Sequence, residues 1–527
     1  MTGATVLVVG ALLSAATAFA LRLAACRGGR FRGVDTWFHL HVADCIRETG
    51  RLPRRLECFT PTGVYDYPPG LAWLLSRFAK DAAQAWQWLV SPAADAAQAA
   101  VTLAIAWYLW RNAAAAVTAG FIYAISPLVM AQSLQLTPRA LGSLLFAGAV
   151  SLAIIASQAS HTAAIVAFAG AVVCAGLLLM THRMGTQALL FVAAGIAAAG
   201  NLAVLAGLGA AVAITVLMTR GRYITILRGH LAELRFWFRN VHRRDDNRPL
   251  KLLSPEAEAA RPRKGLLRRS AAQAYSLVRH LPFVLVFAYA SWRFWAVAPL
   301  SRPFVIWAAT AYAAFLVTTH IRALKFLGQG YRYLTCAALP VAAISGGALF
   351  AASDGWPLVA AYVAAGLGLA ISLRELYGWY GWAERHATET LNPALMSVLD
   401  CLREQSEDGV ACVPFGLANS VAYFTGKRVL RHGASAALPQ LEFFYPLVQE
   451  PLDSVVARVG ANWLLVDVRS FPPGFVVTCG EVAFERHPYR LFRVAARRED
   501  SAATGATAAA AEGFDEVGRA RERPEVA

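Results

Sequence analysis

The sequence predicts an α-helical, multi-pass membrane protein of about eleven transmembrane helices, followed by a small α/β domain. Of the 527 residues, 57% are hydrophobic and only 16% are charged, whereas soluble domains carry about 25% charged residues. Apolar stretches close to the roughly 20 residues that cross a bilayer recur through residues 1–373. From residue 374 the composition becomes that of a soluble domain.

Eleven apolar segments are long enough to be interpreted as spans. The first one, Thr5–Leu23, lacks the basic N-terminal region of a signal peptide, so it is interpreted as a retained span. Gly200-Asn201 is either a tight turn between two spans or a break within one helix. The predicted spans are 3–25, 93–110, 113–131, 139–157, 162–180, 186–199, 202–218, 281–298, 303–319, 332–352 and 356–373.

The alternation of these spans places the polar segments on one side of the membrane, which predicts a single active cavity. The opposite side keeps only short turns. Because most basic residues lie with the polar segments, the positive-inside rule would put this side in the cytoplasm. The segments on this side are 34–70, 135–139, 181–185, 219–280, 328–333 and everything after 374.

The net charge of +16 indicates anionic partners. The basic residues cluster beside spans, so membrane lipids or phosphate-bearing lipids are expected rather than nucleic acid. Within the basic segment 219–280, residues 223–241 have apolar positions at helical spacing with arginines between them. This pattern predicts an amphipathic helix on a membrane surface or over a cavity. A solvated linker held near headgroups is the open alternative.

Residues 374–495 are predicted to form the C-terminal α/β domain, and the tail 496–527 is predicted to be disordered because it is poor in aromatic residues. Asn392 is placed near the cap of its first helix. The expected elements are a helix at 392–405, buried strands at 409–415 and 462–468, a short helix ending at Gly460, and a hairpin at 481–494.

Asp35 is the first candidate for chemistry. If residues 36–47 are helical, Asp35 and His39 share one face of the helix. A carboxylate beside a histidine can act as a general base or hold a divalent metal. In the alternative interpretation, Asp35 caps the helix and Asp44 pairs with Arg47.

The run Tyr65 to Gly70, Tyr-Asp-Tyr-Pro-Pro-Gly, is the second candidate. The prolines fix an extended entry into the next helix, so a rigid turn is one interpretation. Tyr65 and Tyr67 could also wall a sugar site.

Arg332, between Tyr331 and Tyr333, is the third candidate. An arginine at a membrane interface can clamp a phosphate through two hydrogen bonds. Snorkelling toward the interface is the alternative. Arg139, His182 and Arg183 carry the same two interpretations.

Together these segments resemble the GT-C superfamily of membrane glycosyltransferases, in particular oligosaccharyltransferase catalytic subunits and protein O-mannosyltransferases. The resemblance rests on Asp-x-x-x-His from Asp35 to His39, Tyr-Pro-Pro at 67–69, Tyr-Arg-Tyr at 331–333, and many spans before an α/β domain. It implies that the donor is a sugar on a polyprenyl phosphate or diphosphate. It also implies that the active site and the C-terminal domain are extracytoplasmic.

Carried onto this sequence, the resemblance makes Asp35 the catalytic carboxylate, with His39 supporting it and Arg332 contacting the lipid phosphate. The acceptor, whether protein, glycan or lipid, is not identified. The candidate substrate-binding residues are Asp44, Tyr65, Asp66, Tyr67, Arg139, His182, Arg183, Tyr331 and Arg332.

Two motifs of the superfamily are missing. Residues 413–426 stand where oligosaccharyltransferases have Trp-Trp-Asp-Tyr-Gly, so recognition of a glycosylation sequon is not expected. Residues 135–139 stand where a second acidic motif would be, so no cofactor is certain. A divalent metal, Mg or Mn, stays an open alternative. We therefore expect transfer of one sugar or a short glycan.

Two other functions compete with this hypothesis. A transporter or lipid flippase would place charged residues or broken segments in the middle of the membrane, whereas the polar residues here cluster at span ends. An enzyme using nucleotide sugars in the cytoplasm would fit the basic loops, but the sequence has no Asp-x-Asp motif. A membrane protein without chemistry is the remaining alternative.

Overall fold

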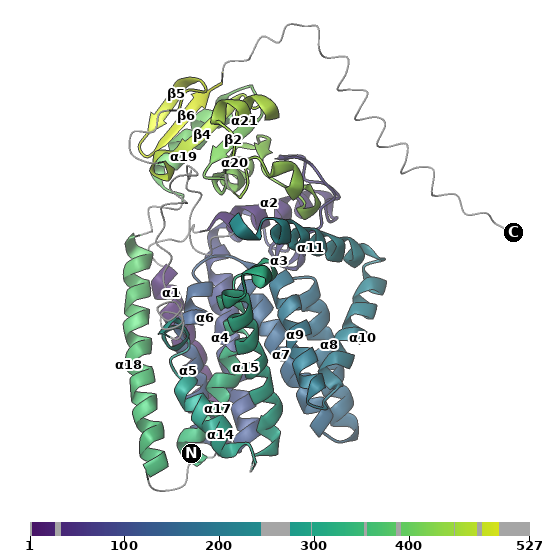
Figure 1. Cartoon of the computed structure of the whole chain (residues 1–527), viewed down its shortest axis with the longest axis vertical. Helices are drawn as coiled ribbons and strands as arrows, with labels where there is room; N and C mark the ends of the chain where they lie inside the picture. Colours follow the sequence, from purple (N-terminus) through teal and green to yellow (C-terminus); the bar gives the residue numbers. More distant parts are fainter. Residues whose placement is uncertain are drawn as a thin grey trace, which may run out of the picture.

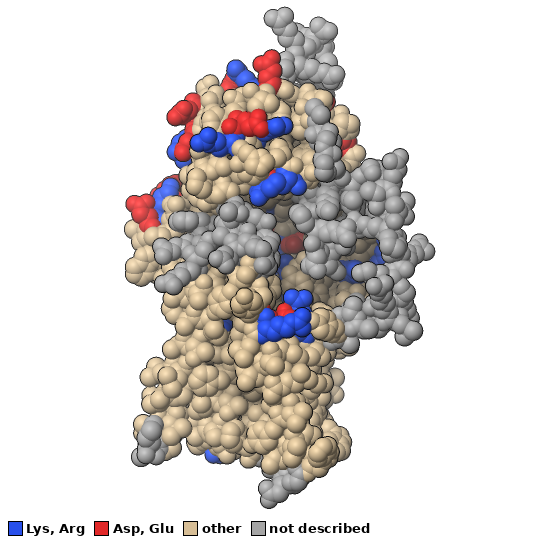
Figure 2. Space-filling model, turned by 90° about the vertical axis from the view of Figure 1, so that its left-hand side faces the viewer, with Lys and Arg blue, Asp and Glu red and all other residues tan. Residues whose placement is uncertain are grey.

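The computed structural model describes residues 3–26, 33–243, 275–296, 298–351, 356–385, 391–446, 448–471 and 477–494. The predicted tail 496–527 and residues 244–274 of the predicted basic segment 219–280 lie outside these ranges. A bundle of helices forms the lower part and a β-sheet with its own helices forms the upper part (Figure 1). Figure 2 shows that Lys, Arg, Asp and Glu gather on the upper part, while the lower part of that face is almost free of them.

The bundle makes the chain a multi-pass membrane protein. Among the described residues, six helices are long and apolar enough to cross a bilayer, a seventh results if one bent pair counts as a single span, and four further apolar helices are shorter. Each predicted span contains helix, but the number of eleven crossings is not confirmed. The bundle helices are α1 (Gly3–Cys26), α4 (Lys80–Trp110), α5 (Ala113–Ala124), α6 (Pro127–Gln132), α7 (Pro138–Gln158), α8 (His161–Leu179), α9 (Arg183–Ala198), α10 (Ala203–Met218), α14 (Val284–Phe294), α15 (Arg302–His320), α16 (Tyr331–Thr335), α17 (Ala338–Ala351) and α18 (Trp356–Arg385).

Four predicted spans differ from the observed helices, and one of them, predicted at 356–373, continues as α18 to Arg385. The span predicted at 113–131 is divided into α5 and α6, because Pro127 has no N–H to continue the first helix and begins the second. The span predicted at 332–352 is likewise divided into α16 and α17. The helix at the predicted span 93–110 is α4, which begins earlier, at Lys80, and continues through Pro92 without a break. Membrane helices tolerate such prolines where neighbouring groups satisfy the freed carbonyls.

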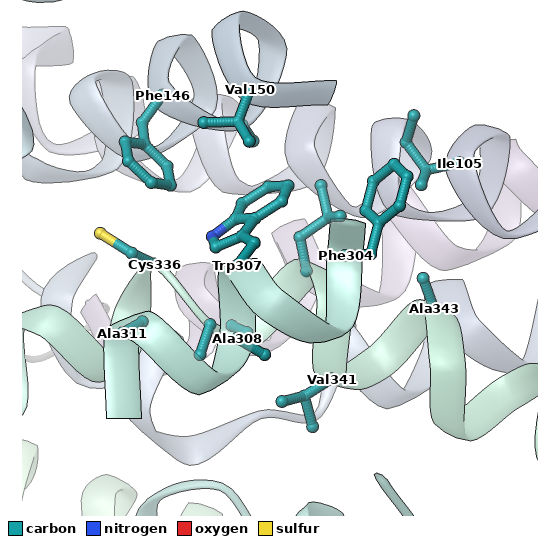
Figure 3. Close-up of a cluster of buried hydrophobic side chains, with 14 of the residues drawn as sticks. Ile105, Phe146, Val150, Phe304, Trp307, Ala308, Ala311, Cys336, Val341 and Ala343 are labelled. Atoms are coloured by element: carbon teal, nitrogen blue, oxygen red, sulfur yellow. The ribbon is translucent and has the colours of Figure 1, made fainter. Parts of the chain in front are cut away.

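Buried aromatic side chains hold the bundle together (Figure 3). Trp307 and Phe304 of α15 are fully buried and pack toward α7 and α4. The Trp307 ring meets Phe146 of α7 edge to face, with 5.5 Å between the ring centroids. Ala308 and Ala343 lie around them, and such small residues let membrane helices approach closely.

The upper part is a six-stranded sheet in the order β1-β3-β2-β4-β6-β5. Strands β1, β3, β2 and β4 are parallel, and β6 and β5 are antiparallel additions. The strands predicted around residues 410 and 465 and the predicted final hairpin are present. The strands are β1 (Phe59–Thr60), β2 (Val410–Val413), β3 (Val429–Leu430), β4 (Trp463–Asp467), β5 (Glu481–Arg486) and β6 (Tyr489–Arg493).

Helices cover both faces of the sheet, because alternate residues of each strand point to opposite faces. Side chains of Cys412 and Leu465 pack with α19 (Pro393–Glu404) and α20 (Leu417–Thr425). Side chains of Val413 and Val466 pack with α21 (Leu452–Val459). The predicted cap is confirmed, since the Asn392 side chain accepts a hydrogen bond from the N–H of Leu395.

The first polar segment also belongs to this upper part. Its strand β1 pairs in parallel with β3, although the sequence predicted only a loop of the membrane domain there. A two-residue strand leaves no periodic pattern in the sequence. The helix α2 (Val34–Thr49) buries Trp37, Leu40 and Val42 in the same core as α19 and α20. A short helix, α3 (Gly70–Leu75), then leads back toward the bundle.

The predicted amphipathic helix is observed as α11 (Arg222–Arg239), which bends by 118° from α10. It lies crosswise between the bundle and the sheet (Figure 1). Tyr223, Ile226 and Phe236 are buried on one side of the helix. Residues 222–239 are therefore not a solvated linker. The exposed apolar side chains of α11 are Ile224, Leu227, Leu231 and Phe238.

Replacing Phe59 by alanine tests whether the first segment is part of the sheet. The Phe59 side chain is fully buried, so Phe59→Ala should lower the free energy of unfolding by about 3–5 kcal/mol. Hydrogen exchange of residues 54–64 should rise in the variant. Val64→Ala is the matched control, because Val64 is 53% exposed. Equal behaviour of the two variants would show that β1 is not integrated into the sheet.

Candidate active site

Asp35 lies in the first turn of α2, held from two sides. Gly33 is the helix N-cap, with φ of 93°, so Asp35 is not the cap. On one side, the Asn419 side-chain amide of α20 donates a hydrogen bond of 2.8 Å to the carbonyl of Val34. On the other side, the Thr36 hydroxyl donates to the carbonyl of Leu136 at 3.4 Å. The carboxylate therefore stands where the upper part meets the bundle.

Within the described part of the chain, Asp35 differs from Asp44, Asp66 and Glu233 in its lack of an ion pair. Among the described residues, no Lys, Arg or His nitrogen lies within 4.0 Å of its carboxylate. Asp44, by contrast, pairs with Arg47 and with Lys80, the latter at 3.1 Å. The Asp44–Arg47 pair proposed from the sequence is thus confirmed.

His39 follows Asp35 by one turn, so the two share a face of α2 as expected. It is only 2% exposed, and its Nδ1 atom has no hydrogen-bond partner in the described part of the chain. Burial lowers the pKa of His39 to about 4, although the negative charge of Asp35 opposes this shift. The imidazole is therefore neutral at pH 7. It lies beside Tyr67, with 5.7 Å between the ring centroids.

Two arginines of the bundle, Arg139 and Arg332, lie close to one another near Asp35 of α2. Arg139, at the start of α7, interacts electrostatically with Arg332, Asp35, Tyr331 and Tyr67. The ion pairs of the described residues include neither Arg139 nor Arg332, and Nε of Arg332 is buried without a hydrogen-bond partner. Two guanidinium groups kept close together without a carboxylate between them form a ready site for an anion.

His182 lies beside these arginines as the N-cap of α9. Its Nδ1 atom accepts a hydrogen bond of 3.2 Å from the N–H of Gly185. Burial, followed by the positive charges of Arg139 and Arg332, lowers the pKa of His182 to about 3. Because Nδ1 is an acceptor here, the proton of the neutral ring is on Nε2. His182 can thus donate one hydrogen bond but adds no charge.

Asp66 and Arg183, both predicted to bind substrate, bind one another. Arg183 Nη2 lies 2.9 Å from Asp66 Oδ1, and its Nη1 lies 2.6 Å from Glu233 of α11. The Asp66 carboxylate also accepts hydrogen bonds from the backbone N–H groups of Ser435 and Ala436. One buried cluster therefore joins the first segment, α9, α11 and the upper part.

Aromatic rings continue from this cluster toward Asp35. The Arg183 guanidinium lies over the Tyr67 ring, 4.9 Å from its centroid. Phe38 contacts both Tyr65 and Tyr67. Tyr65 is 1% exposed and its hydroxyl has no partner among the described residues. Burial raises the pKa of Tyr67 to about 12, so its hydroxyl stays protonated.

The upper part adds two residues that the sequence analysis missed. Arg431 and His432 directly follow β3, at the carboxyl ends of the parallel strands, where open α/β sheets commonly bind ligands. Arg431 interacts electrostatically with Asp35, and its Nη1 donates to the carbonyl of Phe415 at 3.1 Å. Burial, then the charge of Arg431, lowers the pKa of His432 to about 3. The signal available in the sequence was two basic residue types, Arg431 and His432, directly after the apolar pair Val429-Leu430.

The described residues do not fit a resident metal ion. They contain no group of three His, Cys, Asp or Glu side chains arranged to hold one. Near Asp35, the carboxylates of Asp44, Asp66 and Glu233 are each engaged by a cation. We therefore derive no chemical step through a metal.

The arrangement places one unpaired carboxylate against arginines from two parts of the molecule. In Figure 2, charged side chains are visible in a recess between the upper and lower parts. Asp35, His39, Tyr67, Arg139, His182, Tyr331 and Arg332 are connected by the electrostatic interactions described above. A carboxylate can accept a proton there, and the arginines can hold an anionic group.

No model of a known protein family matches the chain, and no curated protein matches it by sequence. Solved structures do match. An oligosaccharyltransferase of Archaeoglobus fulgidus, solved in complex with Zn and sulfate, has a TM-score of 0.57 and 12% identity over 87% of this chain and 68% of its own. The oligosaccharyltransferase AglB of the same organism, in complex with an inhibitory peptide and a dolichol-phosphate, has a TM-score of 0.55 and 13% identity over 89% and 69%.

A third structure, ArnT from Cupriavidus metallidurans bound to undecaprenyl phosphate, has a TM-score of 0.54 and 12% identity over 92% of this chain and 98% of its own. AglB and ArnT are GT-C glycosyltransferases. The resemblance to this superfamily is thus confirmed at the level of the fold.

The buried histidine predicts a pH-dependent stability. The pKa of His39 is 6.5 in its ordinary environment and about 4 in the fold. Protonation of His39 therefore favours unfolding. The contribution of the neutral imidazole to the free energy of unfolding is complete above pH 6.5 and decreases as the pH falls toward 4. The loss should be about 1.4 kcal/mol per pH unit over this window. Denaturant unfolding between pH 7.5 and 5 should show a shallower dependence for His39→Gln. Identical slopes would contradict the buried, neutral histidine.

Proposed function

We propose that this chain is an integral-membrane glycosyltransferase. It transfers a sugar or a short glycan from a polyprenyl phosphate or diphosphate to an acceptor on the extracytoplasmic side. One observation carries the proposal: Asp35, which has no ion pair among the described residues, interacts electrostatically with Arg139, and Arg139 lies near Arg332. The GT-C fold of the chain supports it.

The arginines of the bundle form the donor side of the proposed site. Arg139 is the second residue of α7, and Arg332 is the second residue of α16. The similar ArnT structure contains undecaprenyl phosphate and the similar AglB structure a dolichol-phosphate. In this chain, the two guanidinium groups and the Nε2–H of His182 would hold the phosphate of such a lipid, with its chain among the bundle helices.

Transfer breaks the bond between the anomeric carbon and the phosphate oxygen, and negative charge develops on the departing lipid phosphate. Fixed positive charges that meet this charge stabilise the transition state. The acceptor oxygen or nitrogen forms the new bond to the anomeric carbon and gives its proton to the Asp35 carboxylate. Neutral His39, buried beside Asp35, would orient the carboxylate or the acceptor without adding charge.

The remaining candidates take supporting roles in this proposal. Tyr67 lies beside His39, Tyr65 packs on Phe38, and Tyr331 lies near Arg139. Asp66 and Arg183 hold the first segment to α9 because their charges compensate each other. Asp44 anchors α2 through Arg47 and Lys80.

A transporter or lipid flippase is the second candidate. It is favoured by two broken bundle segments, α5–α6 and α16–α17, since transporters bind substrates at discontinuous helices. A liposome assay separates the two functions, because a transporter would move a lipid-linked sugar across the bilayer without breaking its glycosyl bond.

Substituting Asp35 tests the catalytic carboxylate. Asp35→Asn keeps the shape but cannot accept a proton, so kcat for transfer from a lipid-linked sugar should fall by roughly 10²–10⁴. Binding of the donor should change little. Asp400→Asn is the matched control, because Asp400 is an exposed residue of α19 that pairs only with Arg403 among the described residues. Retained turnover in Asp35→Asn would refute the assignment.

Substituting Arg332 tests the phosphate site without requiring transfer. Arg332→Ala removes one charge-assisted contact, worth about 1.5–3 kcal/mol, so the Kd for undecaprenyl phosphate should rise roughly tenfold to a hundredfold. Arg332→Lys should lose less affinity. Arg322→Ala, at an exposed position before α16, is the control. Unchanged affinity in Arg332→Ala would place the phosphate elsewhere.

A further inference from the structure

A buried ion pair lies inside the bundle, away from the groups used in the proposed reaction. Arg22 of α1 and Asp95 of α4 are 0% and 1% exposed, and Nε of Arg22 lies 3.4 Å from Oδ2 of Asp95. Asp95 lies near the start of the predicted span 93–110 but near the middle of the observed helix α4, which begins at Lys80. Charged residues within membrane helices are costly and usually have a function.

The two residues of the pair form hydrogen bonds to the chain on either side of the short helix α6. Arg22 Nη1 donates to the carbonyl of Ala124, the last residue of α5 before the break. Terminal carbonyls of a helix lack a partner within the helix, so this contact satisfies one of them. Asp95 accepts a hydrogen bond from the hydroxyl of Ser133, the residue that follows α6. One ion pair therefore contacts the chain both before and after α6.

The segment after α6 carries this constraint to the proposed site. The Ser91 hydroxyl of α4 donates to the carbonyl of Gln135 at 3.0 Å. The next carbonyl, that of Leu136, accepts the bond from Thr36 beside Asp35. Gly33, on the other side of Asp35, packs so closely on Gln135 that a Cβ at Gly33 would lie 2.3 Å from its Oε1 atom.

The same segment leads directly into the other half of the site. Pro138 begins α7 immediately after Thr137, and Arg139 is the next residue. Residues 133–137 thus contact the residues that flank Asp35 and also set the start of the helix that carries Arg139. Their position is fixed from the interior of the bundle by Asp95 and Ser91.

We propose that Arg22 and Asp95 are positioning residues that set the placement of Asp35 relative to Arg139. This inference rests on the proposed function for its catalytic consequence. Neither residue touches the proposed substrate groups. Their effect passes through α6 and residues 133–137, so it should appear in kcat rather than in donor binding, which Arg332 and His182 also support.

The test uses the full-length protein in lipid nanodiscs. The double variant Arg22→Met/Asp95→Leu removes the pair without leaving an unpaired buried charge, and such apolar replacements are commonly tolerated by the fold. Hydrogen exchange of residues 133–139 should rise at least tenfold, and kcat should fall about tenfold. The Kd for undecaprenyl phosphate should change less than threefold.

Arg458→Met/Glu450→Leu is the matched control. It removes an ion pair of the upper part, between Arg458 of α21 and Glu450, and so lies in a different part of the fold from residues 133–139. Exchange of 133–139 and kcat should both stay at the wild-type level in this control. The single variant Asp95→Asn, which leaves Arg22 unpaired, should show the same local increase in exchange as the double variant.

Unchanged exchange of residues 133–139 in the double variant would overturn the inference. A rise in exchange with unchanged kcat would overturn it as well, because the segment would then move without affecting the reaction. If the wild-type protein transfers no lipid-linked sugar, the proposed function fails. The exchange measurement still decides in that case whether the ion pair holds the segment, so the two failures are distinguishable.

Discussion

The ion pair between Asp66 and Arg183 is the interaction on which the rest of the site depends. Both side chains are buried, and they belong to the first polar segment and to α9. Asp66 also receives two backbone N–H groups of the upper part, and Arg183 also binds Glu233 of α11. Removing Arg183 would leave the buried Asp66 carboxylate without a cation, which is strongly destabilising. The pair therefore locks the sheet, α11 and the bundle in one arrangement.

This arrangement distinguishes three acidic residues that hold the structure through ion pairs from Asp35, the proposed catalytic carboxylate. Asp44, Asp66 and Glu233 are each neutralised by a cation, whereas Asp35 has no ion pair in the described part of the chain. Arg139 reaches the same place from the bundle and Arg431 from the upper part. The nearby histidines are neutral because burial lowers their pKa values. The positive charge at this place therefore comes from the arginines and exceeds the negative charge of Asp35, which suits the proposed lipid phosphate.

Much of this arrangement could be predicted from the sequence. Apolar length located the bundle helices, and the alternation of spans brought Asp35, Arg139, His182 and Arg332 to one side. Other features depend on distant contacts that leave no local pattern. Strand β1 has only two residues and needs β3, about 370 positions later, as its partner. The mutual pairing of Asp66 and Arg183, 117 residues apart, likewise follows from tertiary packing alone.

The most direct test of the proposed reaction is to determine which side of the membrane the sheet faces. A compartment-sensitive reporter fused after residue 494 measures it, because β6 ends at Arg493. The account predicts an extracytoplasmic reporter, with Asp35 and the arginines on the side where the proposed lipid-linked donor is used. A cytoplasmic reporter would agree with the positive-inside rule and contradict the proposed donor and mechanism together.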